Sequence, residues 1–393
     1  NDWNGAIKDL NEAILLNTND AWAYMTRGDA YGNKRDYKQA IKDLTESIRL
    51  DPKHASSYDS RGVFYAIQKQ WDQAIADYDE AVRLGIKGSK VYADRGNAYM
   101  AKEQWEKAIA DLDERLFYDP KDAASYVSRG RAYGQTRNYK GAFNDFDKAL
   151  LLNSKNSEAF RYRGLTFYFQ HEYDLAIADY TESLRLRPMT VSTLADRGLA
   201  YAGKERWDDA LDDLYLAIKL DPTNSGCYVN RAFVYSKTHR VENAIDDLNH
   251  AIKLNPTNAT AFHDLADDYY QQRDYNKAFK ELNEGLRLKH DSALLLNLFA
   301  WYRAVCPDAA FRNGKEAVHD ATKACEISKW KSWSYIDTLA AAYAEIGDFD
   351  QALKYEKQAS TMEELTEKNI ADLKERLELY QTHKPYRENS RSD

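Results

Sequence analysis

The sequence contains few of the residues that interrupt helices or form covalent cross-links. Its 393 residues include only 17 Gly, 7 Pro and 3 Cys. So little Gly and Pro argues against a loop-rich or disordered chain. Cys227, Cys306 and Cys325 show no C-x-x-C spacing, and their odd number leaves at least one thiol unpaired. These counts argue against a disulfide framework and favour a reducing, cytoplasmic compartment.

Long apolar segments and clusters of positive charge are also missing. No apolar stretch reaches the length of about 18 residues that a membrane-spanning helix needs. No basic segment followed by an apolar one opens the chain, so we expect no signal peptide. The net charge is −8, and Lys and Arg form no long run. This charge argues against nucleic acid as a partner, because phosphate binding needs clustered cations.

The sequence also lacks the motifs that usually mark catalytic and metal sites. It has no phosphate-binding G-x-x-x-x-G-K-[ST] loop, no H-E-x-x-H, no G-x-S-x-G and no EF-hand loop. Its 8 His are scattered without metal-ligand spacing. We therefore expect no enzyme, no catalytic residue, no metal site and no cofactor.

What the sequence does contain is a strict repeat. A glycine recurs every 34 residues, and alanine continues the series: Gly28, Gly62, Gly96, Gly130, Gly164, Gly198, Ala232 and Ala266. An aromatic follows each of these by three residues, and an alanine follows each by twelve, as Tyr31 and Ala40 do in the first repeat. Small side chains at fixed positions let two helices approach closely, so each repeat is predicted to be a helix pair.

The first repeat illustrates the predicted pair. A helix over 21–33 is followed by a break at 32–36 and a second helix over 37–50, which Pro52 terminates. The fragments Tyr24-Met-Thr-Arg-Gly-Asp-Ala-Tyr31, Asp36-Tyr-Lys-Gln-Ala40 and Leu50-Asp-Pro52 resemble the tetratricopeptide repeat. The resemblance implies an all-α fold, a right-handed superhelix of antiparallel helix pairs with a concave groove that binds other proteins.

The repeat phase divides the chain into six parts. We expect a half repeat over 1–20, eight contiguous repeats over 21–292, an atypical repeat with a longer turn over 293–330, a last repeat over 331–362, a capping helix over 363–382 and a mobile tail over 383–393. The fragments Leu298-Phe-Ala-Trp301 and Cys306-Pro-Asp308 resemble the C-terminal repeat pair of many large bacterial proteins of this family.

Two charged residues also keep the repeat phase. An arginine precedes each repeat glycine and also Ala232, from Arg27 to Arg231, and an aspartate recurs in the second helices, from Asp43 to Asp247. Repetition at one phase predicts a structural ladder of Arg–Asp pairs rather than a ligand site. The sequence leaves open whether each arginine pairs within its own repeat or with a neighbouring one.

Binding residues should lie where the repeat pattern allows variation. In this family, the stripe at positions 2, 5, 9 and 12 of the first helix faces the groove, with Ala21 as position 1. The candidates at and beside this stripe are Val63, Ile67, Met100, Arg131, Arg161, Leu165, Tyr168, Phe169, Leu199, Phe233 and Tyr270. An apolar groove of this kind suits a protein or peptide with hydrophobic anchors, and the arginines could orient an acidic group. Some of these side chains could instead pack between adjacent first helices.

Two further readings remain open at this stage. The array could be the recognition or regulatory arm of a larger enzyme whose catalytic part precedes residue 1. Self-association through the N-terminal end is also possible, because the half repeat over 1–20 lacks a first helix to cover its face.

Overall fold

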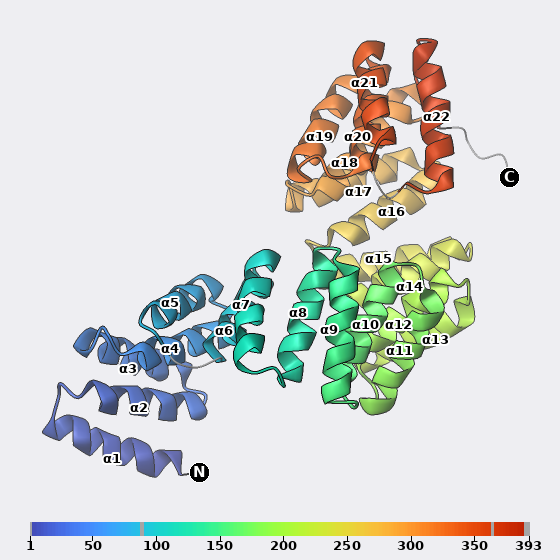
Figure 1. Cartoon of the computed structure of the whole chain (residues 1–393). Helices are drawn as coiled ribbons and strands as arrows, with labels where there is room; N and C mark the ends of the chain where they lie inside the picture. Colours follow the sequence, from blue (N-terminus) through green and yellow to red (C-terminus); the bar gives the residue numbers. More distant parts are fainter. Residues whose placement is uncertain (1, 87–89, 363–364, 389–393) are drawn as a thin grey trace. The chain divides into compact units, whose positions relative to one another are not determined.

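The computed structural model describes residues 2–86, 90–362 and 365–388, and over these ranges it contains α-helices, one short 3-10 helix and no strand (Figure 1). The chain forms two compact units, Asn1–Ala200 and Tyr201–Asp393, which we describe separately. The predicted all-α class and the consecutive helix pairs are confirmed.

Unit 1 consists of helix pairs that follow one another along the chain. Its helices are α1 (Trp3–Leu16), α2 (Ala21–Asn33), α3 (Tyr37–Leu50), α4 (Ala55–Ile67), α5 (Trp71–Arg83), α6 (Lys90–Ala101), α7 (Trp105–Tyr118), α8 (Ala123–Gln135), α9 (Tyr139–Leu152), α10 (Ser157–Phe169), α11 (Tyr173–Leu186) and α12 (Val191–Gly203), the last of which crosses into unit 2.

The repeat glycines mark the closest contact within each pair. A Cβ atom on Gly62 would lie 2.7 Å from the Tyr78 ring, and one on Gly130 would lie 2.7 Å from the Phe146 ring. Both rings are almost fully buried. An alanine at either glycine would overlap the ring opposite, which explains why glycine recurs at this phase.

The turn inside each pair is equally regular. One residue in each turn adopts a left-handed backbone conformation, as Arg35 does with φ 64° and Arg137 with φ 60°. The next residue is the N-cap of the second helix, where Asp36 accepts a hydrogen bond from the amide of Gln39 at 3.2 Å. This local geometry reverses the chain in few residues, so the two helices run antiparallel.

The predicted arginine ladder is present, and it resolves the question of pairing. Arg129 on α8 donates two hydrogen bonds to Asp145 on α9, at 2.8 and 2.7 Å, and a third to Asp113 on α7 at 2.6 Å. The same bidentate hydrogen bonding joins Arg27–Asp43, Arg61–Asp77, Arg95–Asp111 and Arg163–Asp179 in unit 1 and Arg231–Asp247 in unit 2. The unit 1 arginines therefore pair within a repeat and also reach the preceding one.

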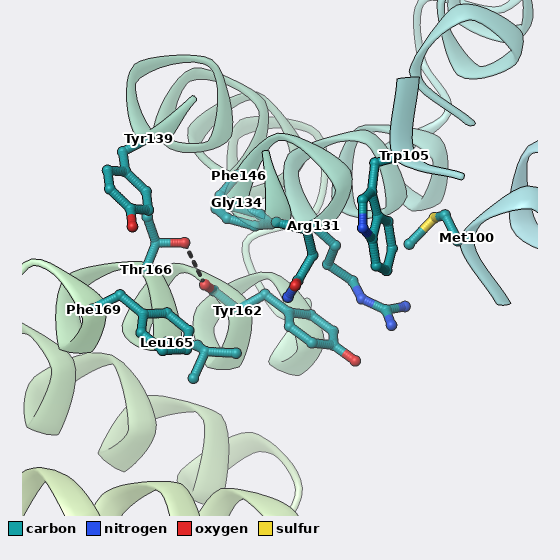
Figure 2. Close-up of a pocket in the computed structure, with 11 residues that line it drawn as sticks. Met100, Trp105, Arg131, Gly134, Tyr139, Phe146, Tyr162, Leu165, Thr166 and Phe169 are labelled. Carbon is teal, nitrogen blue, oxygen red and sulfur yellow. Dashed lines mark hydrogen bonds between the residues drawn. The ribbon is translucent and has the colours of Figure 1, made fainter. Parts of the chain in front are cut away.

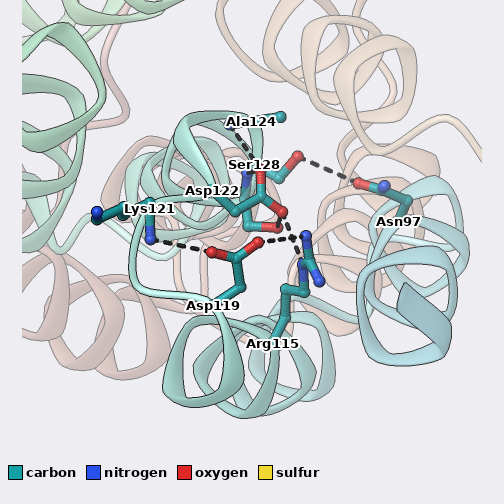
Figure 3. A network of polar contacts seen from close by, with 8 residues as sticks. Asn97, Arg115, Asp119, Lys121, Asp122, Ala124 and Ser128 are labelled. Carbon is teal, nitrogen blue, oxygen red and sulfur yellow. Dashed lines mark hydrogen bonds and ion pairs between the residues drawn. The ribbon is translucent and has the colours of Figure 1, made fainter. Parts of the chain in front are cut away.

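Other polar contacts hold successive pairs together at their turns. Arg115 on α7 binds Asp122 at 2.7 Å and Asp119 at 3.1 Å, while Ser128 on α8 donates to Asn97 on α6 at 3.2 Å (Figure 3). Asp122 also caps α8 by accepting from the amide of Ser125. The connection between repeats is therefore as well defined as the turn within one.

Unit 2 continues with α13 (Trp207–Leu220), α14 (Ser225–Lys237), α15 (Val241–Leu254), α16 (Ala259–Gln271), α17 (Tyr275–Leu288), α18 (Ala293–Val305), the 3-10 helix (Ala309–Phe311), α19 (Gly314–Ile327), α20 (Trp333–Glu345), α21 (Phe349–Ser360) and α22 (Glu367–Gln381). The 3-10 helix lies in the segment where the sequence predicted a longer turn.

The last helix packs on α20 and α21 through a buried polar cluster. Arg376 donates to Asp337 at 2.8 Å and lies 3.5 Å from Glu356, and all three side chains are buried. Burial and the adjacent Asp337 carboxylate raise the pKa of Glu356 to about 10. The protonated form of Glu356 is therefore favoured beside the Arg376–Asp337 pair.

The buried side of α22 is not simply the side on which its apolar residues lie. Leu373, Arg376 and Tyr380 are buried, whereas Ile370 is 40% exposed. Beyond α22 we expected a mobile tail over 383–393. Residues 389–393 lie outside the described residues, but Tyr386 and Arg387 pack against the rest of unit 2.

Candidate functional site

The predicted groove residues differ in how far they are accessible. Arg131 is exposed, and Ile67, Phe169 and Phe233 are 50%, 54% and 41% exposed. The half-buried candidates are Val63, Arg161, Leu165, Tyr168 and Leu199. Met100 and Tyr270 are buried, at 7% and 5%. These two side chains therefore act mainly in packing.

Four of the candidates line one hollow in unit 1. Met100, Arg131, Leu165 and Phe169 border a space of about 480 Å³, which includes its opening to solvent (Figure 2). The sequence did not single out its other lining residues, which are Trp105, Gly134, Gln135, Tyr139, Phe146, Tyr162 and Thr166. The lining is mostly apolar and aromatic, with Arg131 as its only charged side chain.

The hollow forms where two small side chains meet. In this array, position 12 of one first helix faces position 10 of the next. Gly32 and Phe64 fill this contact between α2 and α4, because a Cβ on Gly32 would lie only 1.9 Å from the Phe64 ring. Between α8 and α10, a Cβ on Gly134 would meet nothing closer than the Thr166 hydroxyl, at 3.8 Å. The space that Phe64 fills in one repeat is therefore open in another.

Arg131 and Tyr162 form the polar edge of the hollow, and Arg161, outside the lining, contacts the same tyrosine. The Tyr162 ring lies between Arg131, whose guanidinium is 4.4 Å from the ring centre, and Arg161, at 5.0 Å. Arg161 also pairs with Asp196 at 2.8 Å. Among the described residues, no carboxylate pairs with Arg131. Arg131 is therefore the cation here that is available to an acidic group.

An acidic cluster lies elsewhere on the first helices of unit 1. Asp59 and Asp94 have the same separation along the chain as Arg161 and Asp196, but here both members are carboxylates. Burial and the charge of Asp94 raise the pKa of Asp59 to about 6. Burial likewise raises the pKa values of Asp29 and Asp94. This end of the face therefore repels an acidic ligand.

The described residues offer neither a cluster of metal ligands nor an exposed thiol. They contain no group of three or more His, Cys, Asp or Glu side chains placed to hold a metal ion. All three cysteines are buried, and burial raises the pKa of Cys325 to about 12. Burial raises the pKa of Cys306 as well, which disfavours the reactive thiolate. No helix in the described ranges is long and apolar enough to cross a membrane.

Comparison with solved structures shows a shared fold at low sequence identity. Yeast Tom70 aligns over 97% of this chain and 92% of its own, with 16% identity and a TM-score of 0.58. A tetratricopeptide repeat protein from Parabacteroides merdae aligns over 62% of this chain and 97% of its own, with 20% identity and a TM-score of 0.56. Human IFIT1, solved as a dimer with m7Gppp-AAAA, aligns over 91% and 94%, with 16% identity and a TM-score of 0.53.

Comparison with curated protein sequences gave no match. The family comparison did: one profile described as tetratricopeptide repeat matches residues 25–89, 93–159 and 163–225, and a second matches 225–258. Both profiles describe repeats that form binding scaffolds, and neither is an enzyme family. Together with the helix pairs, they show that the chain belongs to the tetratricopeptide repeat family.

Proposed function

We propose that the chain is a non-enzymatic scaffold that binds a peptide segment of another protein in the hollow between α8 and α10. The observation that carries this proposal is the unfilled contact at Gly134 and Thr166, which leaves apolar side chains beside an exposed arginine. A hollow of this size accepts one large apolar side chain, such as leucine or phenylalanine.

The charges around the hollow specify the rest of the ligand. Arg131 lies at its edge and would pair with an aspartate, a glutamate or a terminal carboxylate of the peptide. The raised pKa values of Asp29, Asp59 and Asp94 mark a part of the first-helix face that disfavours acidic groups. We therefore expect a segment with one apolar anchor and a neighbouring acidic residue.

The alternative function, an arm of a larger enzyme, would use the same hollow for recognition. No contact in the described residues favours it over a scaffold. Self-association also remains a proposal: α1 exposes Leu15 and Leu16, at 80% and 90%, and these side chains could contact a second copy.

A peptide selection tests the proposed ligand. Peptides selected from a displayed random library on the intact chain should share an apolar residue beside an acidic one. Their binding should fall at least about tenfold in Leu165→Asp, because a carboxylate in the apolar lining is costly to desolvate. Leu175→Asp is the matched control, because Leu175 is 49% exposed on a second helix, α11. Equal binding to both variants would remove the hollow as the site.

A further inference from the structure

The segment that follows α22 is bound by the rest of unit 2. The amide of Glu388 donates to the carbonyl of Val305 at 3.1 Å, and the Arg387 guanidinium donates to the carbonyl of Ala304 at 3.2 Å. Arg387 also forms an ion pair with Glu345 at the end of α20. Both the backbone and a side chain of the segment are therefore recognised at the C-terminal ends of α18 and α20.

Tyr386 is the apolar anchor of this segment. Its ring centre lies 5.9 Å from that of Trp301, and it packs beside Ala341 and Ala342. The Arg376 guanidinium lies 5.6 Å from the centres of both the Tyr386 and Trp301 rings. Tyr386 thus occupies an aromatic and cationic binding site on α18 and α20, the first helices of the last two pairs.

The binding site of Tyr386 includes the repeat positions that we predicted from the sequence to face the groove. If Ala300 and Ala340 take the place of the repeat glycine at position 8, then Trp301 and Ala341 are at position 9, and Ala304 is at position 12. Position 9 is held by Arg131 and Leu165 in unit 1, and position 12 by Tyr168. The terminal segment therefore covers the part of unit 2 that corresponds to a binding face.

The end of the segment approaches a pair of stacked tyrosines. The rings of Tyr270 and Tyr302 stack at 3.7 Å, and Tyr302 donates to Asp267 at 2.7 Å. Burial raises the pKa of Tyr270, and the negative charge of Glu388 adds to this shift. The backbone amide of Glu388 holds this residue on Val305, so the site holds an aromatic, an arginine and an acidic residue in that order.

We propose that the surface of α16, α18 and α20 is a docking site for an extended peptide with the order aromatic, arginine, acidic, and that residues 386–388 occupy it in cis. A partner that carries such a segment must displace residues 386–388 before it can bind. This site is separate from the hollow at Gly134, so either can fail while the other stands.

Glu345 gives the site its selectivity for arginine. Arg312 donates to Glu345 at 3.2 Å and holds this carboxylate in place while it pairs with Arg387. The Arg387 guanidinium also reaches a helix carbonyl, which a lysine ammonium at the same place could not do in the same fork geometry. A partner with lysine in place of this arginine should therefore bind more weakly.

Competition with a synthetic segment tests the proposal. The probe is a fluorescent peptide Thr-His-Lys-Pro-Tyr-Arg-Glu, which repeats residues 382–388. It should bind the double variant Tyr386→Ala, Arg387→Ala at least about tenfold more tightly than it binds the unchanged chain. In the unchanged chain, residues 386–388 compete with the probe at a high effective concentration. The control Lys384→Ala alters an exposed side chain and should behave as the unchanged chain does.

Two further measurements make the result decisive. A probe carrying Arg387→Glu should lose binding to the double variant, because it would face Glu345 with like charge. In the unchanged chain, millimolar probe should speed hydrogen exchange of residues 384–388, a readout that needs no variant. Equal probe binding to all chains, or exchange that the probe leaves unchanged, would overturn the proposal. The assignment in cis would also be overturned if the fraction of dimer rose with protein concentration because two copies exchange residues 386–388.

Discussion

The first helices present an open face in unit 1 and a covered one in unit 2. Arg131 on α8 and Leu165 on α10 border a hollow that reaches solvent. On α18 and α20, the corresponding repeat positions hold Trp301 and Ala341, and Tyr386 packs over them. The difference comes from side chains that vary on a constant framework of helix pairs.

The covered face shows what kind of segment such a surface accepts. Residues 386–388 pair with helix-end carbonyls through a backbone amide and a guanidinium, while one aromatic ring supplies the apolar contact. The open face offers a deeper apolar space but has Arg131 at its edge instead of Glu345. The residue beside the apolar anchor should therefore be acidic in a ligand of the open face and basic in a ligand of the covered face.

The largest expected effect concerns the framework beneath both faces. Arg129→Met leaves the buried Asp145 without its cation, and Arg303→Met does the same to Asp320. Each should lower the free energy of unfolding by about 3 kcal/mol. Denaturant titration measures this loss, and Arg49→Met, which breaks an exposed pair with Glu46, should cost less than about 1 kcal/mol. Equal costs at all three sites would show that the ladder does not support either face.

A smaller effect should separate the filled contact from the open one. Gly32→Ala forces a Cβ against Phe64 and should cost about 1–3 kcal/mol. Gly134→Ala meets only Thr166, at van der Waals distance, and should stabilise the helix by up to about 1 kcal/mol. Thermal unfolding of the two variants should shift in opposite directions. A loss at Gly134 as large as that at Gly32 would mean that the hollow is not open.

The smallest effect depends on pH and concerns the acidic end of the open face. The pKa of Asp59 is raised to about 6 in the folded chain, so the folded state holds a proton that the unfolded state has released. Stability should therefore decrease as the pH rises from about 4 to above 6. Asp59→Asn, which resembles the protonated form, should raise the melting temperature at pH 7.5 by about 2–4 °C and have little effect at pH 4. Asp246→Asn, at an exposed carboxylate of α15, should show no such pH dependence.

The sequence was sufficient to predict the features that repeat. The spacing of Gly28, Tyr31 and Ala40 gave the helix pairs, because close approach of helices restricts side-chain size at the same place in each repeat. The common phase of Arg129 and Asp145 predicted their pairing for the same reason. Whether an arginine also contacts the preceding repeat depends on the reach of its side chain, which the spacing does not specify.

The features that do not repeat were harder to predict. The hollow depends on Gly134 and Thr166 together, and comparison with Gly32 and Phe64 would have been the signal. Glu356 stands where earlier repeats carry large apolar side chains such as Leu44, so it could have been recognised as a buried carboxyl group. The terminal segment has no periodicity, and its binding depends on contacts with helices distant in the sequence.

The arginine ladder has a gap in unit 2, between α16 and α17. Here Leu265 replaces the arginine, and within the described part of the chain Glu281 pairs only with the adjacent Lys280, at 3.9 Å. Elsewhere, opening one helix pair must separate charges that are partly shielded from water. The pair α16 and α17 lacks this arginine–aspartate pair. When the protein is stretched or partly denatured, the array should therefore separate into independently unfolding segments at this place.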